Sequence, residues 1–267
     1  MPASNTRNIG LARALSKLGY CSRSQAALLI RAGRVKINGA VRRDPETPVH
    51  MGGDHLSVDD RPIAAARYVY LMMNKPRGLV TTASDEEGRD TIYSVLNAAG
   101  DSLPWLAPVG RLDKASEGLL LLTNDSEWAA RISAPESHVP KIYHVQIDRV
   151  ATGEVIRAIE RGVKSSDGDT LRATRCSLLR TGERNSWLEI TLDEGKNRQI
   201  RRMLAALECE VLRLVRVAIG PLQLGNLAKG TYRPLTAGEK RSLGNSRGTF
   251  VSRDVPPAII RKNVKRD

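Results

Sequence analysis

One acidic residue stands out by its place in the sequence rather than by its type. Asp113 follows Gly110 and Arg111 in a short loop directly before the apolar run Leu119 to Leu122. Because that run has no alternation of polar and apolar residues, it is typical of a strand buried on both faces. A carboxylate ahead of such a strand either forms part of a turn or belongs to a reactive site. Taken alone, an aspartate after a glycine is more often a turn former.

A cluster of arginines near Gly195 is the second candidate for chemistry. Arg198, Arg201 and Arg202 have the spacing i, i+3 and i+4, which would place three guanidinium groups on one face of a helix. Apolar residues of the same segment would face the core on the opposite side. No acidic residue lies between the arginines, and a helix N-terminus is already electropositive. The segment therefore predicts an anion-binding face.

Other kinds of reactive site are not indicated by the sequence. Gly195-Lys196 is similar to the end of a phosphate-binding loop, but Ile190 stands where that loop needs its first glycine, and no Gly-x-Gly-x-x-Gly motif follows a strand. We therefore expect no nucleotide cofactor. The four histidines and three cysteines lack metal-ligand spacing, so no metal site is expected. An odd number of widely separated cysteines predicts reduced thiols, as in the cytoplasm.

The charge balance predicts a polyanionic partner. Among 267 residues, 42 Lys and Arg stand against 29 Asp and Glu, which gives a net charge of +13. Nucleic acid is the first candidate for the partner. A basic protein of the membrane surface would need an amphipathic helix with aromatic anchors, and only 4% of the residues are aromatic. We expect no membrane partner, no secretory leader and no membrane span.

Residues 9–58 predict a compact N-terminal module. A first helix is expected around Leu11–Leu18, a second from Ser22 to Ile30, and a hairpin turn at Asn38–Gly39. Since the module is too small for an enzyme, its concentration of cations favours phosphate binding over a merely solvated surface. The cations in question are Arg13, Lys17, Arg23, Arg31, Arg34 and Lys36.

The rest of the chain predicts a larger α+β domain. Residues 59–67 break the pattern and are interpreted as a linker, and residues 68–239 mix strands and helices without the regular alternation of a doubly wound sheet. Residues 240–267 hold eight Lys or Arg against two Asp and are expected to form a basic, disordered tail.

Two resemblances sharpen these expectations. The stretch LARALSKLGYCSRSQAALLIRAGRVKINGAV resembles the S4-like RNA-binding domain, which implies docking on structured RNA by shape and phosphate contacts. The motifs NKPRGLVTT, DEEGRDTIYSVL, GRLDKASEGLLLLTND, KIYHV and EGKNRQIRRM resemble the pseudouridine synthases of the RsuA/RluB type, which modify ribosomal RNA. The resemblance implies a small S4-like domain followed by a catalytic domain with a mixed or antiparallel sheet. Ser126 departs from the family's glycine after Asn-Asp, and we expect this to affect only the turn.

The resemblance also implies roles for individual residues. Asp113 matches the catalytic aspartate, and Tyr143 matches the tyrosine that stacks on the target base and is implicated in proton removal. Arg201 matches the basic residue that pairs with the aspartate. Lys75 and Pro76 match a motif whose role is structural. RNA contacts are expected from the cations of the N-terminal module and from Arg111, Arg198 and Arg202.

The implied reaction suits a single carboxylate. Pseudouridine forms when the glycosidic bond breaks, the uracil rotates, and the base rejoins the same ribose through carbon. A hydrolytic glycosidase usually needs two carboxylates, whereas uracil leaves as a stabilised anion and stays in the site. Asp113 could attack the sugar or remove a ribose proton, and both routes are open. The base must be flipped out of its stack, and no metal or organic cofactor is required.

We therefore predict a site-specific pseudouridine synthase that acts on ribosomal RNA or a pre-ribosomal particle as a cytoplasmic monomer. The segments DEEGRDTIYSVL and GPLQLGNLAKGTYRPL favour large-subunit ribosomal RNA, with small-subunit RNA as the alternative. A non-catalytic RNA-binding or ribosome-assembly protein is a second alternative. A hydrolytic RNA glycosylase, which would release free uracil, is a third.

Overall fold

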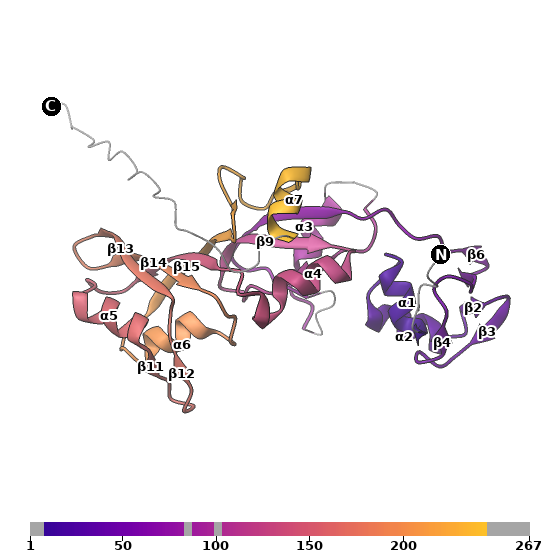
Figure 1. The fold of residues 1–267 in the computed structure, drawn as a ribbon, viewed down its shortest axis with the longest axis horizontal. Helices are drawn as coiled ribbons and strands as arrows, with labels where there is room; N and C mark the ends of the chain where they lie inside the picture. Colours follow the sequence, from indigo (N-terminus) through magenta and orange to yellow (C-terminus); the bar gives the residue numbers. More distant parts are fainter. Residues whose placement is uncertain (1–7, 83–86, 99–102, 245–267) are drawn as a thin grey trace.

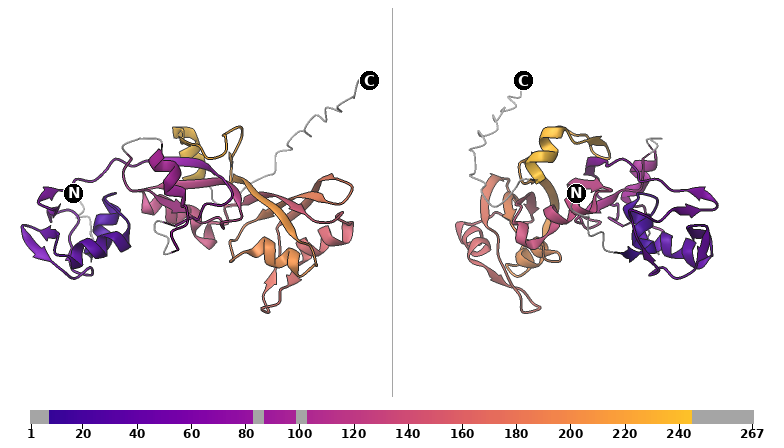
Figure 2. Two further views of the ribbon diagram at one scale, coloured as in Figure 1. Left: turned by 180° about the vertical axis from the view of Figure 1, so that it is seen from behind. Right: turned by 45° about the vertical axis from the view of Figure 1, so that its right-hand side comes forward.

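The computed structural model describes residues 8–82, 87–98 and 103–244. They form an elongated molecule with the N-terminal module at one end and a larger mixed domain filling the rest (Figures 1 and 2). Within the described residues, no helix is long and apolar enough to span a membrane.

The N-terminal module has the two helices and the hairpin that the sequence predicts. Ser22 begins the second helix through a capping box, in which its Oγ accepts a hydrogen bond from the Gln25 amide at 3.1 Å. The elements are α1 (Leu11–Lys17), α2 (Arg23–Arg31), a two-stranded pair of β1 (Ile9–Gly10) with β4 (Pro48–Val49), and a four-stranded sheet in the order β3 (Ala40–Arg42), β2 (Val35–Ile37), β5 (Leu56–Val58), β6 (Arg61–Pro62). Because β6 lies beyond residue 58, the segment expected to be a linker begins inside this sheet.

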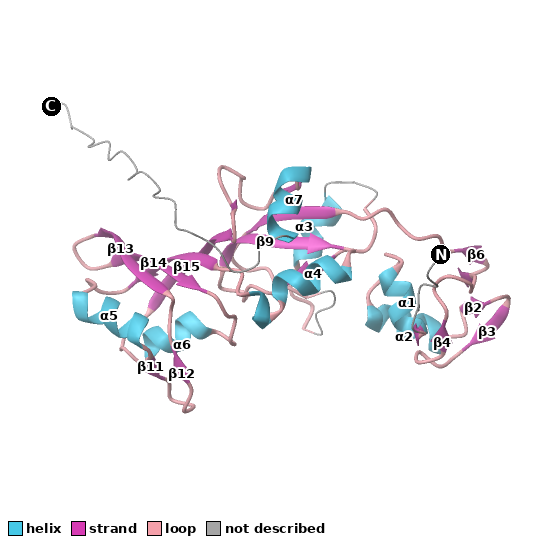
Figure 3. Ribbon diagram, viewed as in Figure 1, coloured by secondary structure: helices cyan, strands magenta, loops and turns pink. Residues whose placement is uncertain are grey.

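The larger domain is built on a nine-stranded mixed sheet, which agrees with the predicted α+β class (Figure 3). Its main path is β13 (Arg175–Thr181), β14 (Ser186–Leu192), β10 (Lys141–Ile147), β15 (Val211–Ile219), β9 (Glu117–Thr123), β7 (Tyr70–Lys75) and β17 (Tyr232–Pro234), with β16 (Leu222–Gln223) beside β15 and β8 (Ala107–Val109) beside β9. The other elements are α3 (Ile92–Ala98), α4 (Ser126–Ser133), the 3-10 turn η1 (Pro135–Ser137), α5 (Gly153–Arg161), α6 (Gln199–Ala205), α7 (Ala237–Gly244) and the hairpin of β11 (Val163–Lys164) with β12 (Thr170–Leu171).

Strand β9 is buried on both faces, as its unbroken apolar run predicts. Leu119 and Leu121 belong to one hydrophobic cluster, and Leu120 and Leu122 belong to the cluster on the opposite face. All four side chains are inaccessible to solvent. Such a strand cannot shift its register by one residue without exchanging its two faces, so the loop before it has a fixed starting point.

The two halves of the sheet meet at its one described parallel pairing, between β9 and β15. Gly118 of β9 lies opposite Arg216 of β15 and has a φ of +101°. A Cβ atom on Gly118 would lie only 2.3 Å from the Arg216 carbonyl oxygen. The Arg216 side chain reinforces the same junction, because its Nε donates to the Leu119 carbonyl oxygen at 2.7 Å.

The N-terminal module is attached to the larger domain through main-chain hydrogen bonds. The Trp105 amide donates to the Gly19 carbonyl oxygen at 2.8 Å, and the Ala66 amide donates to the Leu18 carbonyl oxygen at 3.1 Å. These bonds do not depend on side-chain identity, so the loop after α1 is the point that orients the module.

The first residues of the expected basic tail, 240–244, lie in helix α7. Helix α7 continues to Gly244, and Leu243 is buried in the cluster that surrounds Trp128. An apolar anchor of this kind explains why residues 240–244 are helical despite their charged neighbours. The remainder of the expected tail, residues 245–267, lies outside the described residues.

We predict that Gly118→Ala destabilises the fold far more than Gly78→Ala does. Gly78 has the same φ of +101° but has no atom within 4 Å of an added Cβ, so it isolates the cost of the backbone conformation. That cost is about 1–2 kcal/mol, and Gly118→Ala must also displace a strand. Urea unfolding of both variants measures the difference, and equal losses of unfolding free energy would contradict the role given to the β9–β15 junction.

Candidate functional site

Asp113, Tyr143 and Arg201 line one pocket of about 240 Å³. The pocket walls come from the loop before β9, from β10 and β15, and from the segment that leads into α6. Residues from both halves of the sheet therefore form the pocket, at the junction where β9 meets β15. Asp113 and Arg201 are separated by almost ninety residues in the sequence. They line the same pocket, as expected if both belong to one site.

The backbone of the loop that carries Asp113 is held by a buried ammonium group. Lys75 has no solvent exposure, and its Nζ donates to the carbonyl oxygens of Asp113 at 3.2 Å, Ser116 at 2.9 Å and Pro76 at 3.2 Å. Three carbonyls match the three donors of a lysine ammonium. Burial lowers the pKa of Lys75 to about 8, while the carboxylates of Asp113 and Glu117 act in the opposite sense. The structural role expected of the Lys-Pro motif thus has a specific form, which is to anchor this loop.

The carboxylate of Asp113 forms an ion pair with Arg198, whose Nη1 lies 3.6 Å from Asp113 Oδ2. Arg198 precedes α6 as its N-cap and has a φ of +46°, in the left-handed region that residues other than glycine rarely adopt. Strained backbone of this kind concentrates at functional sites, where the surrounding structure holds it. The direct partner of the aspartate is therefore Arg198, where the sequence predicted Arg201.

Arg201 lies behind the same loop and binds its backbone. Its Nη2 donates to the Ala115 carbonyl oxygen at 3.1 Å, and its Nη1 donates to the Val211 carbonyl oxygen at 3.4 Å. Burial and the neighbouring Arg198 lower the pKa of Arg201, while the carboxylate of Asp113 opposes the shift. The guanidinium of Arg201 thus connects the loop before β9 to the start of β15 and still feels the aspartate electrostatically.

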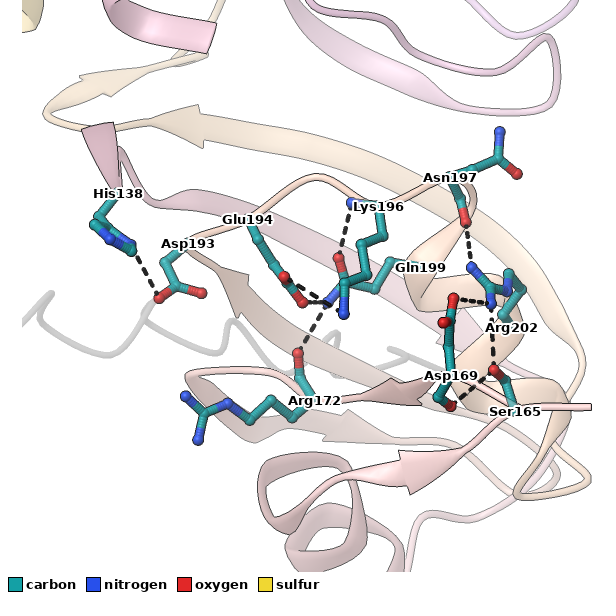
Figure 4. Close-up of polar contacts among 10 residues, drawn as sticks. All are labelled: His138, Ser165, Asp169, Arg172, Asp193, Glu194, Lys196, Asn197, Gln199 and Arg202. Atoms are coloured by element: carbon teal, nitrogen blue, oxygen red, sulfur yellow. Dashed lines mark hydrogen bonds and ion pairs between the residues drawn. The ribbon is translucent and has the colours of Figure 1, made fainter. Parts of the chain in front are cut away.

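Arg202 faces away from this pocket, toward the hairpin of β11 and β12. Its Nη2 forms an ion pair with Asp167. It also contacts the Asp169 carboxylate at 2.7 Å and donates to Ser165 Oγ at 3.3 Å, and Figure 4 shows these two contacts. The single anion-binding face predicted for the three arginines does not form. The reason is that the acidic partners come from a hairpin more than thirty residues away, which a local reading of charge cannot detect.

Tyr143 lines the same pocket from β10. It lies in β10 between Ile190 of β14 and Arg216 of β15, and its ring packs against the hydrophobic clusters of both halves of the sheet. The residue is only partly buried and lines the pocket, so an aromatic surface is available to a planar ligand.

Buried polar atoms without partners gather at the pocket. Among the described residues they are Ser116 Oγ, Arg201 Nε, Arg216 Nη2 and, elsewhere, Trp128 Nε1. The first three belong to pocket-lining residues. Because an unsatisfied buried donor is costly, such a concentration points to a polar ligand. Sequence reasoning missed Arg216, whose signal was a charge inside the apolar strand VLRLVRVAI.

The cations predicted to contact RNA divide into three groups. Arg111 is exposed at the pocket. Three cations of the N-terminal module, Arg13, Arg23 and Arg31, line one groove beside α1 and α2. The other five form ion pairs: Lys17 with Glu127, Arg34 with Asp59 and Lys36 with Asp60, together with Arg198 and Arg202, whose carboxylate partners are given above. No cluster of three or more His, Cys, Asp or Glu side chains that could hold a metal ion occurs in the described part of the chain.

Comparison with known proteins gives two family matches. Residues 69–206 match the family model described as RNA pseudouridylate synthase, and residues 9–56 match the S4 domain. An RNA pseudouridine synthase of Aquifex aeolicus is 37% identical over 230 residues, which cover 86% of this chain and 91% of the relative. The ribosomal large subunit pseudouridine synthase B of Bacillus subtilis is 34% identical over 235 residues, covering 87% and 94%.

A solved structure is similar to this chain over most of its length. A crystal structure of a pseudouridylate synthase superposes with a TM-score of 0.60 at 30% sequence identity, and the match covers 88% of this chain and 99% of that chain.

Replacing Lys75 with methionine should loosen the loop before β9. The variant keeps the length of the side chain but leaves buried carbonyls without a donor, so the free energy of unfolding should fall by on the order of 3 kcal/mol. Amide hydrogen exchange across residues 110–116 should accelerate. Lys114→Met, on the exposed surface of the same loop, is the control. Equal exchange rates in the two variants would show that the ammonium does not hold the loop.

Proposed function

The chain belongs to the family of RNA pseudouridine synthases, and we propose that it converts specific uridines to pseudouridine in large-subunit ribosomal RNA. The observation that carries this proposal is the meeting of Asp113, Tyr143 and an arginine in one pocket. The choice of large-subunit RNA is supported by the Bacillus subtilis relative, whose name specifies that subunit. We further propose that the enzyme works in the cytoplasm as a monomer, on naked RNA or a pre-ribosomal particle.

Asp113 is the group that acts on the sugar in this proposal. The bond between C1′ and N1 of the uridine breaks with its electron pair on N1, the uracil rotates, a bond between C1′ and C5 forms, C5 loses its proton, and N1 gains one. The carboxylate contributes either by attack on C1′ or by removal of a proton from the ribose, and both routes need it ionised. Arg198 Nη1 lies 3.6 Å from Asp113 Oδ2, so this ion pair orients the carboxylate in the pocket.

Tyr143 would supply a surface for the flipped base and accept the proton that the base loses. The uracil has to leave its stack to reach a pocket of this size, and stacking on an aromatic ring offsets part of that cost. Because β10 lies between two strands, the ring is mounted on a rigid element. Arg201 acts as a positioning residue, since its hydrogen bond to Ala115 fixes the loop two residues beyond the aspartate.

RNA outside the pocket is held by exposed cations. Arg111 and Arg198 lie at the pocket, and their guanidinium groups suit phosphate oxygens. The groove lined by Arg13, Arg23 and Arg31 provides a second contact region in the N-terminal module. Phosphate contacts of this kind set position and orientation, while the pocket selects the uridine.

Replacing Asp113 with asparagine should abolish pseudouridine formation and preserve RNA binding. The substitution keeps the size of the side chain and removes its charge, so turnover should fall by at least several orders of magnitude. Binding should be equal or slightly tighter, because a negative charge leaves a basic pocket. Tritium release from RNA labelled at uracil C5 and filter binding measure the two effects. Glu183→Gln, at an exposed loop far along the sheet, is the control for loss of one negative charge.

Substantial turnover by the Asp113→Asn variant would contradict the mechanism. The RNA itself is identified by mapping pseudouridine across ribosomal RNA from cells with and without the gene. Unchanged maps would favour a non-catalytic RNA-binding protein, and release of free uracil by the wild-type protein would indicate a glycosylase.

Removing the three groove arginines together should weaken RNA binding and its salt dependence. Each phosphate contact contributes about 0.7–0.9 to the slope of log K against log salt, so Arg13→Ala, Arg23→Ala and Arg31→Ala combined should reduce that slope by about 2. The matched control replaces the three ion-paired cations Lys17, Arg34 and Lys36 with alanine. It removes the same number of positive charges as the groove variant. Equal slopes for the two triple variants, measured by salt titration of binding, would refute a specific role for the groove.

A further inference from the structure

Lys141 lies inside the pocket beside the tyrosine that the reaction uses. It begins β10, opposite Leu192 of β14 and Ile219 of β15, and both Lys141 and Tyr143 line the pocket. Two residues separate by about 6.7 Å along a strand and point to the same face. The ammonium group and the aromatic ring are therefore within the span of a single nucleotide.

No described residue forms a hydrogen bond or an ion pair with the Lys141 side chain. The nearby carboxylates have other partners. Asp193 Oδ2 lies 3.7 Å from His138 Nδ1, and Asp113 pairs with Arg198. Glu194 accepts a hydrogen bond from Gln199 Nε2 at 2.7 Å and lies 3.7 Å from Lys196 Nζ (Figure 4).

The surroundings of Lys141 disfavour an isolated positive charge. Burial and the neighbouring Arg216 lower the pKa of Lys141, and the carboxylate of Asp193 only partly opposes them. An anionic ligand that contacts both Lys141 and Arg216 would offset the cost of burying these two positive charges side by side. Arg216 contributes a further reason, because its buried Nη2 lacks a partner among the described residues.

We propose that Lys141 binds a phosphate group of the target nucleotide while Tyr143 contacts its base. This inference rests on the proposed function, which makes RNA the ligand of the pocket. Phosphates are the anionic groups of RNA, and a compact ammonium binds them as a point charge. Lys141 would thus select a nucleotide within a chain over a free nucleoside, and it would hold the ribose between an anchored phosphate and an anchored base.

Three small probes test the proposal without turnover and without knowledge of the RNA site. They are uridine, uridine 5′-monophosphate and uridine 3′-monophosphate, titrated by ligand-observed NMR into the full-length wild-type protein, Lys141→Met and Lys196→Met. One of the monophosphates should bind the wild-type protein at least tenfold more tightly than uridine does. Lys141→Met should reduce that advantage below threefold. Lys196→Met is the matched control, since its ammonium already faces Glu194, and it should keep the advantage.

An equal phosphate advantage in the wild-type protein and in Lys141→Met would overturn the proposal, as would its absence from the wild-type protein. A loss that is as large in Lys196→Met would overturn it too, because it would show a general effect of pocket charge. Lys141→Gln gives the same comparison if the methionine variant does not fold. Failure of the proposed function gives a different result, namely unchanged pseudouridine maps, so the two outcomes are distinguishable.

Discussion

A buried lysine ammonium fixes the loop on which the proposed chemistry depends. Lys75 is fully enclosed and bonds three backbone carbonyl oxygens, two of them within the segment from Asp113 to Ser116. A charge in this position costs several kcal/mol unless its donors are satisfied, so the loop and the lysine stabilise each other only in one geometry. The Asp113 carboxylate, to which we assign the reaction, then projects from a backbone held by these hydrogen bonds. This is how a loop residue gains the precision usually provided by a strand or helix.

The parallel seam between β9 and β15 explains where the pocket lies. Each half of the sheet has its own hydrophobic clusters, and the halves join through a short pairing that only glycine permits at position 118. The loop before β9 emerges at that seam, and β10 with α6 belongs to the other half. A pocket at the boundary can therefore combine a carboxylate from one half with an aromatic ring and arginines from the other.

Local patterns predicted the elements, and the motifs predicted which residues share the pocket. The buried strand, the start of a helix at Ser22 and the meeting of Asp113 with Tyr143 all follow from short segments of sequence. The ion pairs could not be predicted from short segments, because their partners are far apart in the chain. Arg202 is neutralised by Asp169 of a distant hairpin, and Arg198 leaves the helix because its backbone adopts a left-handed conformation. Spacing along one helix could reveal neither.

The distribution of ion pairs also limits how RNA can lie on the protein. Many of the cations that give the net charge of +13 are already paired with carboxylates, including Lys17, Arg34 and Arg202. Cations that form no ion pair with a described residue include those of the groove beside α1 and α2, and Arg111 and Lys141 at the pocket. The groove lies in the N-terminal module and the pocket lies in the larger domain, and these two parts lie at different positions along the elongated molecule (Figure 1). A short unstructured RNA could occupy one of them, whereas a folded RNA can engage both at once. Simultaneous engagement raises affinity through effective concentration. Under the proposed function, selection of one uridine therefore depends on the shape of the RNA between the two contacts as well as on the pocket.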